Sequence, residues 1–276
     1  MRVAFQGEPG AYSEAAALEH FGGGTETVPR ESFEAVFAAV EAREVECGLV
    51  PVENSLAGSI HRNYDLLLRH SLSIVGEQYL RVRHCLIAQP GATLAEIRRV
   101  LSHPQALAQC EGYLRSLGDI ESAPAYDTAG AVKMLRDLGD RAGAAIASRR
   151  AAEVYGMQIL AEGIEDDPSN FTRFLAIARE AVSPAGESKT SIVFTLQNAP
   201  GALFKALSVF ALREIDLTKI ESRPLVGKPW EYLFYIDCAG STKDAMMTRA
   251  LDHLSEYALT LRVLGSYARQ RLDSPS

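Results

Sequence analysis

The chain has 276 residues, of which 47% are hydrophobic and 23% are charged, as in an ordinary globular protein with room for two domains. Its formal net charge of -7 provides no global basic field for nucleic acid or anionic membranes. No apolar run approaches the roughly 18 residues of a membrane span, and no basic-then-apolar signal segment opens the chain. We therefore expect a cytoplasmic protein that binds neither nucleic acid nor membrane.

Residues 1 to about 179 alternate short apolar runs with amphipathic stretches, the pattern of βα units in an α/β domain. Ser32 is a candidate N-cap for a helix over residues 32–44, whose apolar residues recur at helical spacing. The expected strands cover residues 2–5, 47–52, 98–102, 144–147 and 174–178, with a long extended stretch over 72–88.

The amino-acid composition changes at residues 180–190, where Pro, Gly, Ser and charged residues predict a linker. After it, the pattern predicts a strand, a helix, two strands, a helix and a strand, which is the order of a ferredoxin-like domain. These elements cover residues 191–196, 200–212, 217–224, 231–238, 243–257 and 259–267.

Four loops of the first part share a turn of small and polar residues that leads directly into a helix: 6–17, 53–65, 103–110 and 127–135. Each offers free N–H groups and the positive end of a helix dipole, reinforced by the hydroxyls of Ser13, Ser55, Ser59 and Thr128. Taken singly, each is equally an ordinary helix N-cap. Because the loops follow predicted strands, where ligands of α/β sheets collect, we expect them to line one carboxylate-binding cleft.

Thr172 and Arg173 stand side by side just before the apolar run 174–178. Adjacent residues of an ideal strand face opposite sides, so both can reach one ligand only at a strand mouth distorted by the preceding "DDPSN". Arg173 suits a bidentate carboxylate contact. The alternative is that Arg173 pairs with Asp166 or Asp167 while Thr172 pairs with a neighbouring strand.

The sequence gives little support for a metal site, a disulfide framework or a catalytic nucleophile. Asp166 and Asp167 have no His or third carboxylate at a ligand spacing. Among the six histidines only His103 heads a helix directly before a proline in a candidate site loop, and no G-x-S-x-G segment marks a nucleophile. No C-x-x-C pair occurs among the four cysteines, for which reduced thiols are expected: Cys47, Cys85, Cys110 and Cys238.

Six segments, in this order, resemble prephenate dehydratase: "FQGEPGAYSE", "PVENSLAGSI" with "NYDLL", "HPQALAQC", "DTAGA", "AAIAS" and "DDPSNFTRF". The C-terminal part, with "GALF" and "ESRP", resembles the ACT regulatory domain of that family. The resemblance implies an α/β fold with a two-lobed, type 2 periplasmic-binding-protein-like catalytic domain over 1–180. Its lobes would be roughly 1–75 with 160–180, and 76–159, followed by a ferredoxin-like βαββαβ ACT domain over 190–270.

The family implies decarboxylative dehydration of prephenate to phenylpyruvate in phenylalanine biosynthesis, without cofactor or metal. By that resemblance, Thr172 assists departure of the hydroxyl and Arg173 anchors the side-chain carboxylate. A threonine hydroxyl is a very weak acid, so Thr172 acts by hydrogen bonding or within a proton relay. Glu53, beside Asn54 and Ser55, is the candidate partner in such a relay, and a structural role for Glu53 is the alternative. The candidate substrate-binding residues are Ser13, Ser59, Gln105, Thr128, Asn170 and Phe171.

The resemblance also implies feedback regulation by L-phenylalanine and a homodimer or homotetramer, with coupling between two sites through lobe opening or closure. The candidate effector-binding residues are Asn198, Gly201, Ala202, Leu203, Glu221 and Ser222. Two alternatives stay open: the same chemistry on arogenate, whose ammonium group needs an acceptor, and a non-catalytic ligand sensor. The "TRF" segment at 172–174 argues against a sensor.

Overall fold

The computed structural model describes residues 1–225, 227 and 230–271. Its contacts divide the chain into two compact units, residues 1–70 with 78–175 and residues 71–77 with 176–276. Residues 71–77 thus group with the C-terminal part, and the strand that they begin continues into the first unit.

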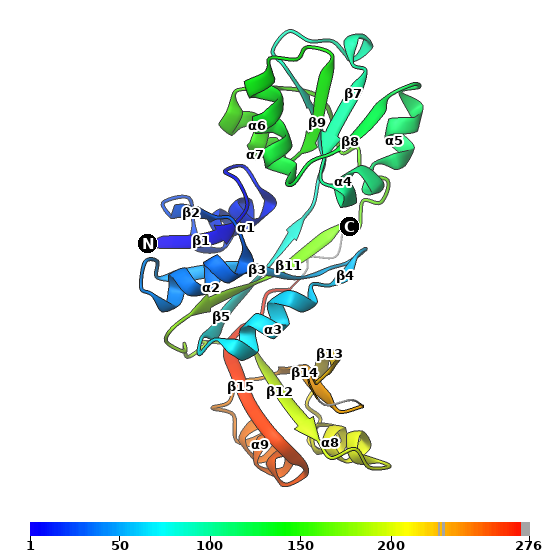
Figure 1. The fold of residues 1–276 in the computed structure, drawn as a ribbon. Coiled ribbons are helices and arrows are strands. Elements are labelled where there is room, and N and C mark those ends of the chain that lie inside the picture. Colours follow the sequence, from blue (N-terminus) through cyan, green and yellow to red (C-terminus); the bar gives the residue numbers. More distant parts are fainter. Residues whose placement is uncertain (226, 228–229, 272–276) are drawn as a thin grey trace. The chain divides into compact units, whose positions relative to one another are not determined.

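The first lobe is built on a mixed sheet with strand order β2-β1-β3-β11-β5, in which β4 pairs with the edge of β3 (Figure 1). Strand β1 is parallel to both β2 and β3, so the connections between them cross over through helices. The strands are β1 (Arg2–Gln6), β2 (Glu26–Arg30), β3 (Cys47–Asn54), β4 (Gly58–Ser59), β5 (Ser73–Arg81) and β11 (Phe171–Ala178). The helices are α1 (Tyr12–Phe21), α2 (Phe33–Glu41) and α3 (His61–Arg69).

The second lobe has strand order β10-β6-β9-β7-β8. Strand β7 is parallel to β8 and β9, while β6 is antiparallel to β9 and β10. The strands are β6 (Cys85–Ala88), β7 (Arg99–Ser102), β8 (Glu121–Pro124), β9 (Gly143–Ala147) and β10 (Gln158–Glu162). The helices are the short 3-10 helix η1 (Leu94–Glu96), α4 (Pro104–Gln109), α5 (Glu111–Ser116), α6 (Thr128–Leu138) and α7 (Arg149–Tyr155).

The chain crosses between the two lobes twice, once between β5 and β6 and once between β10 and β11. The crossings are bonded to each other: the His84 carbonyl accepts from the Gly163 and Ile164 N–H groups at 2.9 and 3.2 Å, and the Val82 N–H donates to the Asn170 carbonyl at 2.8 Å. This two-lobed α/β architecture confirms the predicted fold class.

The C-terminal unit contains an antiparallel sheet of order β13-β14-β12-β15, covered by α8 (Ala202–Ala211) and α9 (Ala245–Tyr257). Its strands are β12 (Ser188–Leu196), β13 (Leu217–Pro224), β14 (Tyr232–Ala239) and β15 (Ala258–Ala268). Phe194, Phe210 and Leu254 are buried in its core. The element order βαββαβ and the strand order are those of a ferredoxin-like domain, as predicted.

Besides the two-residue β4, three strands were missed, and all three lie at sheet edges: β2, β8 and β10. Their sequences, "ETVPR", "ESAP" and "QILAE", lack a clear apolar alternation, because edge strands bury less of their surface. Strand β12 begins at Ser188, inside the predicted linker, since pairing with β14 and β15 on both sides continues to its first residues.

Residues 71–77 belong to the C-terminal unit because they are bonded into it. Lys189 Nζ lies 2.8 Å from Glu77 Oε2, and both side chains are almost completely buried. The Gln270 N–H donates to Glu77 Oε1 at 3.1 Å. Gly265 of β15 lies so close to the Ile74 backbone that a Cβ placed there would be 2.1 Å from the Ile74 carbonyl oxygen. Only glycine permits this approach.

Gly265→Ala is therefore expected to lower the free energy of unfolding by about 1–3 kcal/mol, since the backbone of one of the two segments must move. Urea unfolding followed by circular dichroism measures the change. Gly23→Ala is the matched control, because a Cβ at Gly23 meets open space and should change stability by less than about 0.5 kcal/mol. Equal stability of the two variants would contradict the close approach.

Candidate active site

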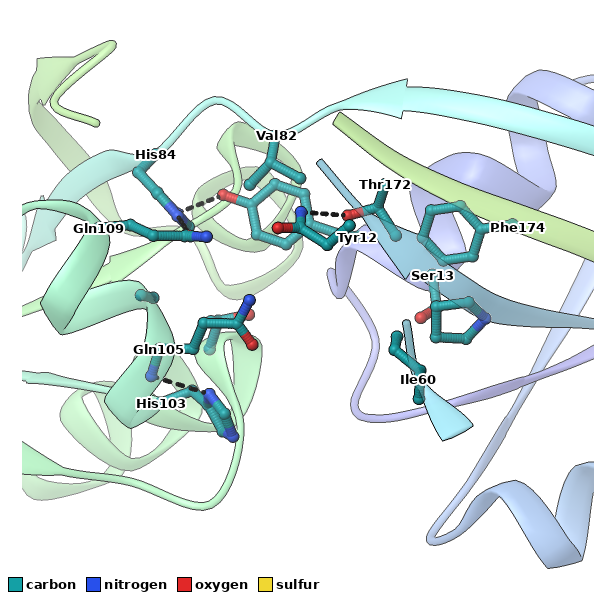
Figure 2. Close-up of a pocket in the computed structure, with 14 residues that line it drawn as sticks. Tyr12, Ser13, Ile60, Val82, His84, His103, Gln105, Gln109, Thr172 and Phe174 are labelled. Atoms are coloured by element: carbon teal, nitrogen blue, oxygen red, sulfur yellow. Dashed lines mark hydrogen bonds between the residues drawn. The ribbon is translucent and has the colours of Figure 1, made fainter. Parts of the chain in front are cut away.

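A cavity of about 180 Å³ lies between the two lobes of the first unit (Figure 2). Both lobes and the first crossing segment contribute to its wall. Its lining residues are Tyr12, Ser13, Pro51, Asn54, Ile60, Thr172 and Phe174 of the first lobe, Val82 and His84 of the crossing, and His103, Gln105, Ala106, Gln109 and Thr128 of the second lobe.

The four loops singled out in the sequence meet at this cavity. Ser13 lies in the first turn of α1, which follows β1, and Asn54 is the last residue of β3. Gln105 lies at the start of α4 after β7, and Thr128 begins α6 after β8. The strand ends and helix starts therefore converge as ligand sites do in α/β sheets.

Asn54 fixes the position of Thr172. Its Nδ2 donates to Thr172 Oγ1 at 3.0 Å, and also to Asn170 Oδ1 and the Phe171 carbonyl at 2.8 and 3.1 Å. Its Oδ1 accepts from the Leu56 and Ala57 N–H groups, so the amide cannot reverse without losing bonds at both ends. Since Thr172 Oγ1 is the acceptor here, its own proton is left for another partner, and none takes it among the residues that the structure describes.

Arg173 does not line the cavity. Strand β11 already begins at Phe171, so Thr172 and Phe174 face the cavity while the residue between them faces the other way. The Arg173 guanidinium lies over the Tyr79 ring, 5.9 Å from its centroid, and the residue is only 5% exposed. The expectation of a distorted strand mouth that brings both side chains into one pocket was wrong, because regular strand pairing extends through the pair.

Other candidates support the wall of the cavity instead of lining it. Ser55 Oγ donates to the Ser169 carbonyl at 2.7 Å and accepts from the Phe171 N–H at 2.9 Å. Glu53 and Ser59 are partners in the β3–β4 pairing, and Asn170 accepts from Asn54. The structure thus brings five of the eleven candidates to the cavity: Asn54, Thr172, Ser13, Gln105 and Thr128.

Sequence reasoning missed Tyr12, His84 and Gln109, which adjoin one another at one end of the cavity (Figure 2). The Tyr12 hydroxyl lies 2.8 Å from His84 Nδ1, and His84 Nε2 lies 3.0 Å from Gln109 Oε1. Burial lowers the pKa of His84 below its usual value, although the Gln109 contact and the Glu165 charge oppose this effect. Tyr12 and Gln109 lie within the quoted motifs, but nothing in the sequence near His84 marks it, because it reaches the cavity only through the crossing of the chain.

A buried carboxylate ties the two lobes together. Glu14 Oε2 accepts from Arg150 Nε and the Gly10 N–H, each at 2.7 Å, and Glu14 Oε1 accepts from Thr27 Oγ1 at 2.7 Å. Burial raises the pKa of Glu14, but the hydrogen bonds from Arg150, Gly10 and Thr27 outweigh it, so that the net pKa is lowered. The ionised form of Glu14 is thus favoured in the folded state.

The described residues contain no group of three or more His, Cys, Asp or Glu side chains that could hold a metal ion. Asp166 Oδ2 accepts from the Gly112 N–H and Asp167 Oδ1 from the Ser169 N–H, so both carboxylates have structural partners. The four cysteines are free thiols. Within the part of the chain that the structure describes, no helix combines the length and apolar character needed to cross a membrane.

The C-terminal unit has a smaller cavity of about 120 Å³ next to the start of α8. Gly201, the N-cap of α8, adopts a left-handed conformation with φ of 77°, and Glu221 and Ser222 lie on β13 outside the lining. Three of the six candidate effector residues therefore line this cavity. Its lining residues are Leu196, Gln197, Asn198, Ala199, Ala202, Leu203, Trp230, Tyr232 and Phe234.

The first unit is a two-lobed α/β domain whose cavity is lined by hydroxyl, amide and imidazole groups, and a ferredoxin-like unit follows it in the chain. This combination is that of a ligand-binding enzyme with a separate C-terminal module. The family model described as prephenate dehydratase matches residues 3–182. The chain belongs to the prephenate dehydratase family, which is named for a lyase activity.

Similar proteins support this assignment. The chain is 54% identical over 278 residues to Arogenate dehydratase/prephenate dehydratase 2, chloroplastic, of Arabidopsis thaliana, covering 97% of this chain and 72% of that one. The solved prephenate dehydratase of Arthrobacter aurescens in complex with L-Phe is 32% identical, with a TM-score of 0.89 over 98% of this chain and 90% of that one. GqqA, described as a novel type of quorum quenching acylases, is 38% identical, with a TM-score of 0.91 over 98% of each chain.

The expected cytoplasmic location is contradicted by these relatives, because the Arabidopsis thaliana proteins that are 54% and 52% identical to this chain are chloroplastic. That expectation rested on the lack of a membrane-length apolar run and of a basic-then-apolar signal segment, and these observations do not distinguish one aqueous compartment from another.

The Glu14 contacts predict how stability depends on pH. Because the folded-state pKa of Glu14 is lowered, its contribution is fully present above the ordinary pKa of 4.5 and is lost as the pH falls through the lower folded value. Glu14→Gln should flatten the stability profile in that acidic range, measured by urea unfolding from pH 6 down. Glu26→Gln, which removes an exposed carboxylate of a surface ion pair, is the control. An unchanged acid profile in the Glu14 variant would contradict this role.

Proposed function

We propose that this protein converts prephenate to phenylpyruvate in the cavity between its lobes, with Thr172 hydrogen-bonding the departing hydroxyl. The observation that carries the proposal is the Asn54 bond to Thr172 Oγ1, which leaves the threonine proton for a ligand in the cavity. This orientation exists before substrate binds, and preorganised donors are the main means by which enzymes stabilise developing negative charge.

The reaction needs a proton and no redox partner. The bond from the ring to its hydroxyl oxygen breaks with both electrons on oxygen, and one proton completes water. The bond to the ring carboxylate breaks at the same ring, releases carbon dioxide and leaves its electron pair in the new aromatic system. A threonine hydroxyl is too weak an acid to supply the proton alone, so Thr172 acts by hydrogen bonding. Two imidazoles in the lining, His84 and His103, are able to transfer a proton, and we assign this role to His84, because both of its ring nitrogens contact other lining side chains.

The lining offers separate places for the two carboxylates of prephenate. Ser13 presents a hydroxyl in the first turn of α1, where N–H groups and the helix dipole favour an anion. The start of α6 is already capped by Asp127, whose carboxylate accepts from the Ala129 N–H and the Thr128 hydroxyl. Ile60, Val82 and Phe174 form an apolar part of the wall. Binding the ring carboxylate there avoids stabilising its charge in the ground state, which would hinder its loss as carbon dioxide.

Arogenate is the second candidate, because the relative that is 54% identical is named for both arogenate and prephenate dehydration. Arogenate carries an ammonium group where prephenate has a keto oxygen. The fourteen lining residues include no Asp or Glu to pair with that ammonium group, which favours prephenate. The amide oxygens of Gln105 and Gln109 are the acceptors available to arogenate.

Purified wild type should form phenylpyruvate from prephenate, and Thr172→Val, which keeps the shape but removes the hydroxyl, should lower kcat by about 10²–10³-fold. Thr172→Ser is the matched control and should retain most of the activity, because it keeps a hydroxyl that can accept from Asn54. Arogenate is assayed in parallel for phenylalanine formation. Full turnover by Thr172→Val would overturn the role of Thr172, and wild-type turnover of arogenate alone would favour the second candidate.

For regulation, we propose that L-phenylalanine binds the cavity next to α8 and lowers activity, in a homodimer or homotetramer. The L-Phe complex of the Arthrobacter aurescens enzyme supports an effector of this chemistry. Asn198 offers an amide, Ala202 and Leu203 leave an apolar space, and the α8 N-terminus suits a carboxylate.

Asn198→Ala should weaken inhibition by L-phenylalanine roughly tenfold, the effect of losing one hydrogen bond to a charged group. Ala202→Phe should abolish inhibition by filling the cavity, while both variants keep uninhibited turnover. Ser208→Ala, outside the cavity lining on the same helix, is the control. Inhibition curves, with calorimetric titration of L-phenylalanine, provide the measurement. Unchanged inhibition in both variants would place the effector elsewhere.

A further inference from the structure

Tyr12 is a side chain that the proposed chemistry does not yet use. It lies at the start of α1, and its ring meets the His84 ring edge to face, with centroids 5.5 Å apart and an interplanar angle of 84°. Its hydroxyl oxygen is 2.8 Å from His84 Nδ1 and 2.9 Å from the Arg83 carbonyl oxygen. A phenol has one proton, so it can donate to only one of these two atoms.

The Arg83 carbonyl settles the choice, because a carbonyl oxygen can only accept. If the Tyr12 proton went to His84 Nδ1, two oxygens without a proton between them would face each other at 2.9 Å. If the proton goes to the Arg83 carbonyl, Tyr12 accepts from His84 through Nδ1–H. The other ring nitrogen, Nε2, then donates to Gln109 Oε1 when the ring is protonated, and accepts from the Gln109 amide after that amide rotates when the ring is neutral. The second arrangement avoids the repulsion of two oxygens that face each other at this distance with no proton between them.

The rest of the His84 environment holds the ring in this position. The residue is only 2% exposed, its N–H donates to Glu165 Oε2 at 2.9 Å, and its carbonyl accepts from Gly163 and Ile164. The remaining ring nitrogen, Nε2, faces Gln109, another lining residue. A Gln amide can accept from a protonated Nε2 or, after rotation of its end group, donate to a bare one.

From this geometry we infer that Tyr12 is a positioning residue that keeps a proton on His84 Nδ1, so that His84 gains and loses its proton at Nε2, on the side of Gln109. This inference deepens the proposed function by assigning the nitrogen from which a proton reaches the departing hydroxyl. The step is balanced: Nε2–H gives up its proton, the leaving oxygen takes it and becomes water, and the neutral ring keeps Nδ1–H. Tyr12 itself exchanges no proton.

Two titratable groups act directly on the His84 ring: Tyr12, which approaches from α1, and Glu165, from the second crossing. Two thiols act on Tyr12 in turn, Cys85 from β6 and Cys110 from the junction of α4 and α5. Burial raises the pKa of both thiols, and burial likewise raises the pKa of Tyr12, so these three groups stay protonated at neutral pH. Tyr12 therefore remains a neutral hydroxyl while His84 titrates.

The first test needs no substrate. Long-range ¹H–¹⁵N spectra of histidine-labelled wild type, assigned by comparison with His84→Gln, should show neutral His84 with a protonated Nδ1 and a bare Nε2. In Tyr12→Phe the Nε2–H form should become substantially populated, because Nδ1 has lost its acceptor. A wild-type ring protonated at Nε2 when neutral would overturn the inference, whatever the protein's substrate.

The second test is kinetic. Tyr12→Phe should lower kcat about tenfold with KM changed less than about threefold, within the effect of one misplaced acid. The apparent pKa of its pH–kcat profile should fall, because the imidazolium form has lost an acceptor, whereas loss of packing alone would not move the profile. Tyr113→Phe, which lies outside the cavity lining, is the control. If the pH–kcat profile of Tyr12→Phe has the same apparent pKa as that of the wild type, the inference is overturned. If the wild type turns over neither prephenate nor arogenate, the proposed function is overturned instead, and the ¹H–¹⁵N spectra alone decide the role of Tyr12.

Discussion

The site depends on the hydrogen bonds between the two segments that cross from one lobe to the other. Those bonds pass through His84: its carbonyl accepts from Gly163 and Ile164, and its N–H is held by Glu165. Because the backbone at this point is bonded on both sides, the His84 imidazole is held at the cavity by the crossing itself.

A second fixed point is the Asn54 amide, which joins the end of β3 to the start of β11. All of its donors and acceptors are in use, and the polar groups around it are short side chains with little rotamer freedom. The Thr172 hydroxyl is consequently oriented by the fold and needs no substrate to arrange it. Together, the Asn54 amide and the His84 crossing place a hydrogen-bond donor and a titratable ring in one cavity, while the apolar wall near Phe174 leaves room for a ring.

Much of the fold could be predicted from the sequence, because the periodicity of hydrophobic residues and the turn residues determine local structure. The Ser32 N-cap, the βα alternation and the βαββαβ tail all follow from short-range pattern, and Ser32 does accept from the Ala35 N–H. The edge strand β2 was missed because a strand with one neighbour needs no strong apolar alternation. The site could be predicted only in part: loops rich in Ser, Thr and Gly indicated Ser13 and Thr128, but no local sequence pattern marks His84.

The sequence by itself determined the fold class, the order of the elements of the C-terminal domain and the family, since these depend on local periodicity and on contiguous motifs. Tertiary structure alone decided which side of β11 each residue faces and therefore why Thr172 reaches the cavity while Arg173 packs on Tyr79. It also decided that residues 71–77 join the C-terminal unit and that Tyr12 meets His84. The physical reason is that strand register and hydrogen-bond partners far apart in the chain are chosen by packing of the whole domain, which no short segment specifies.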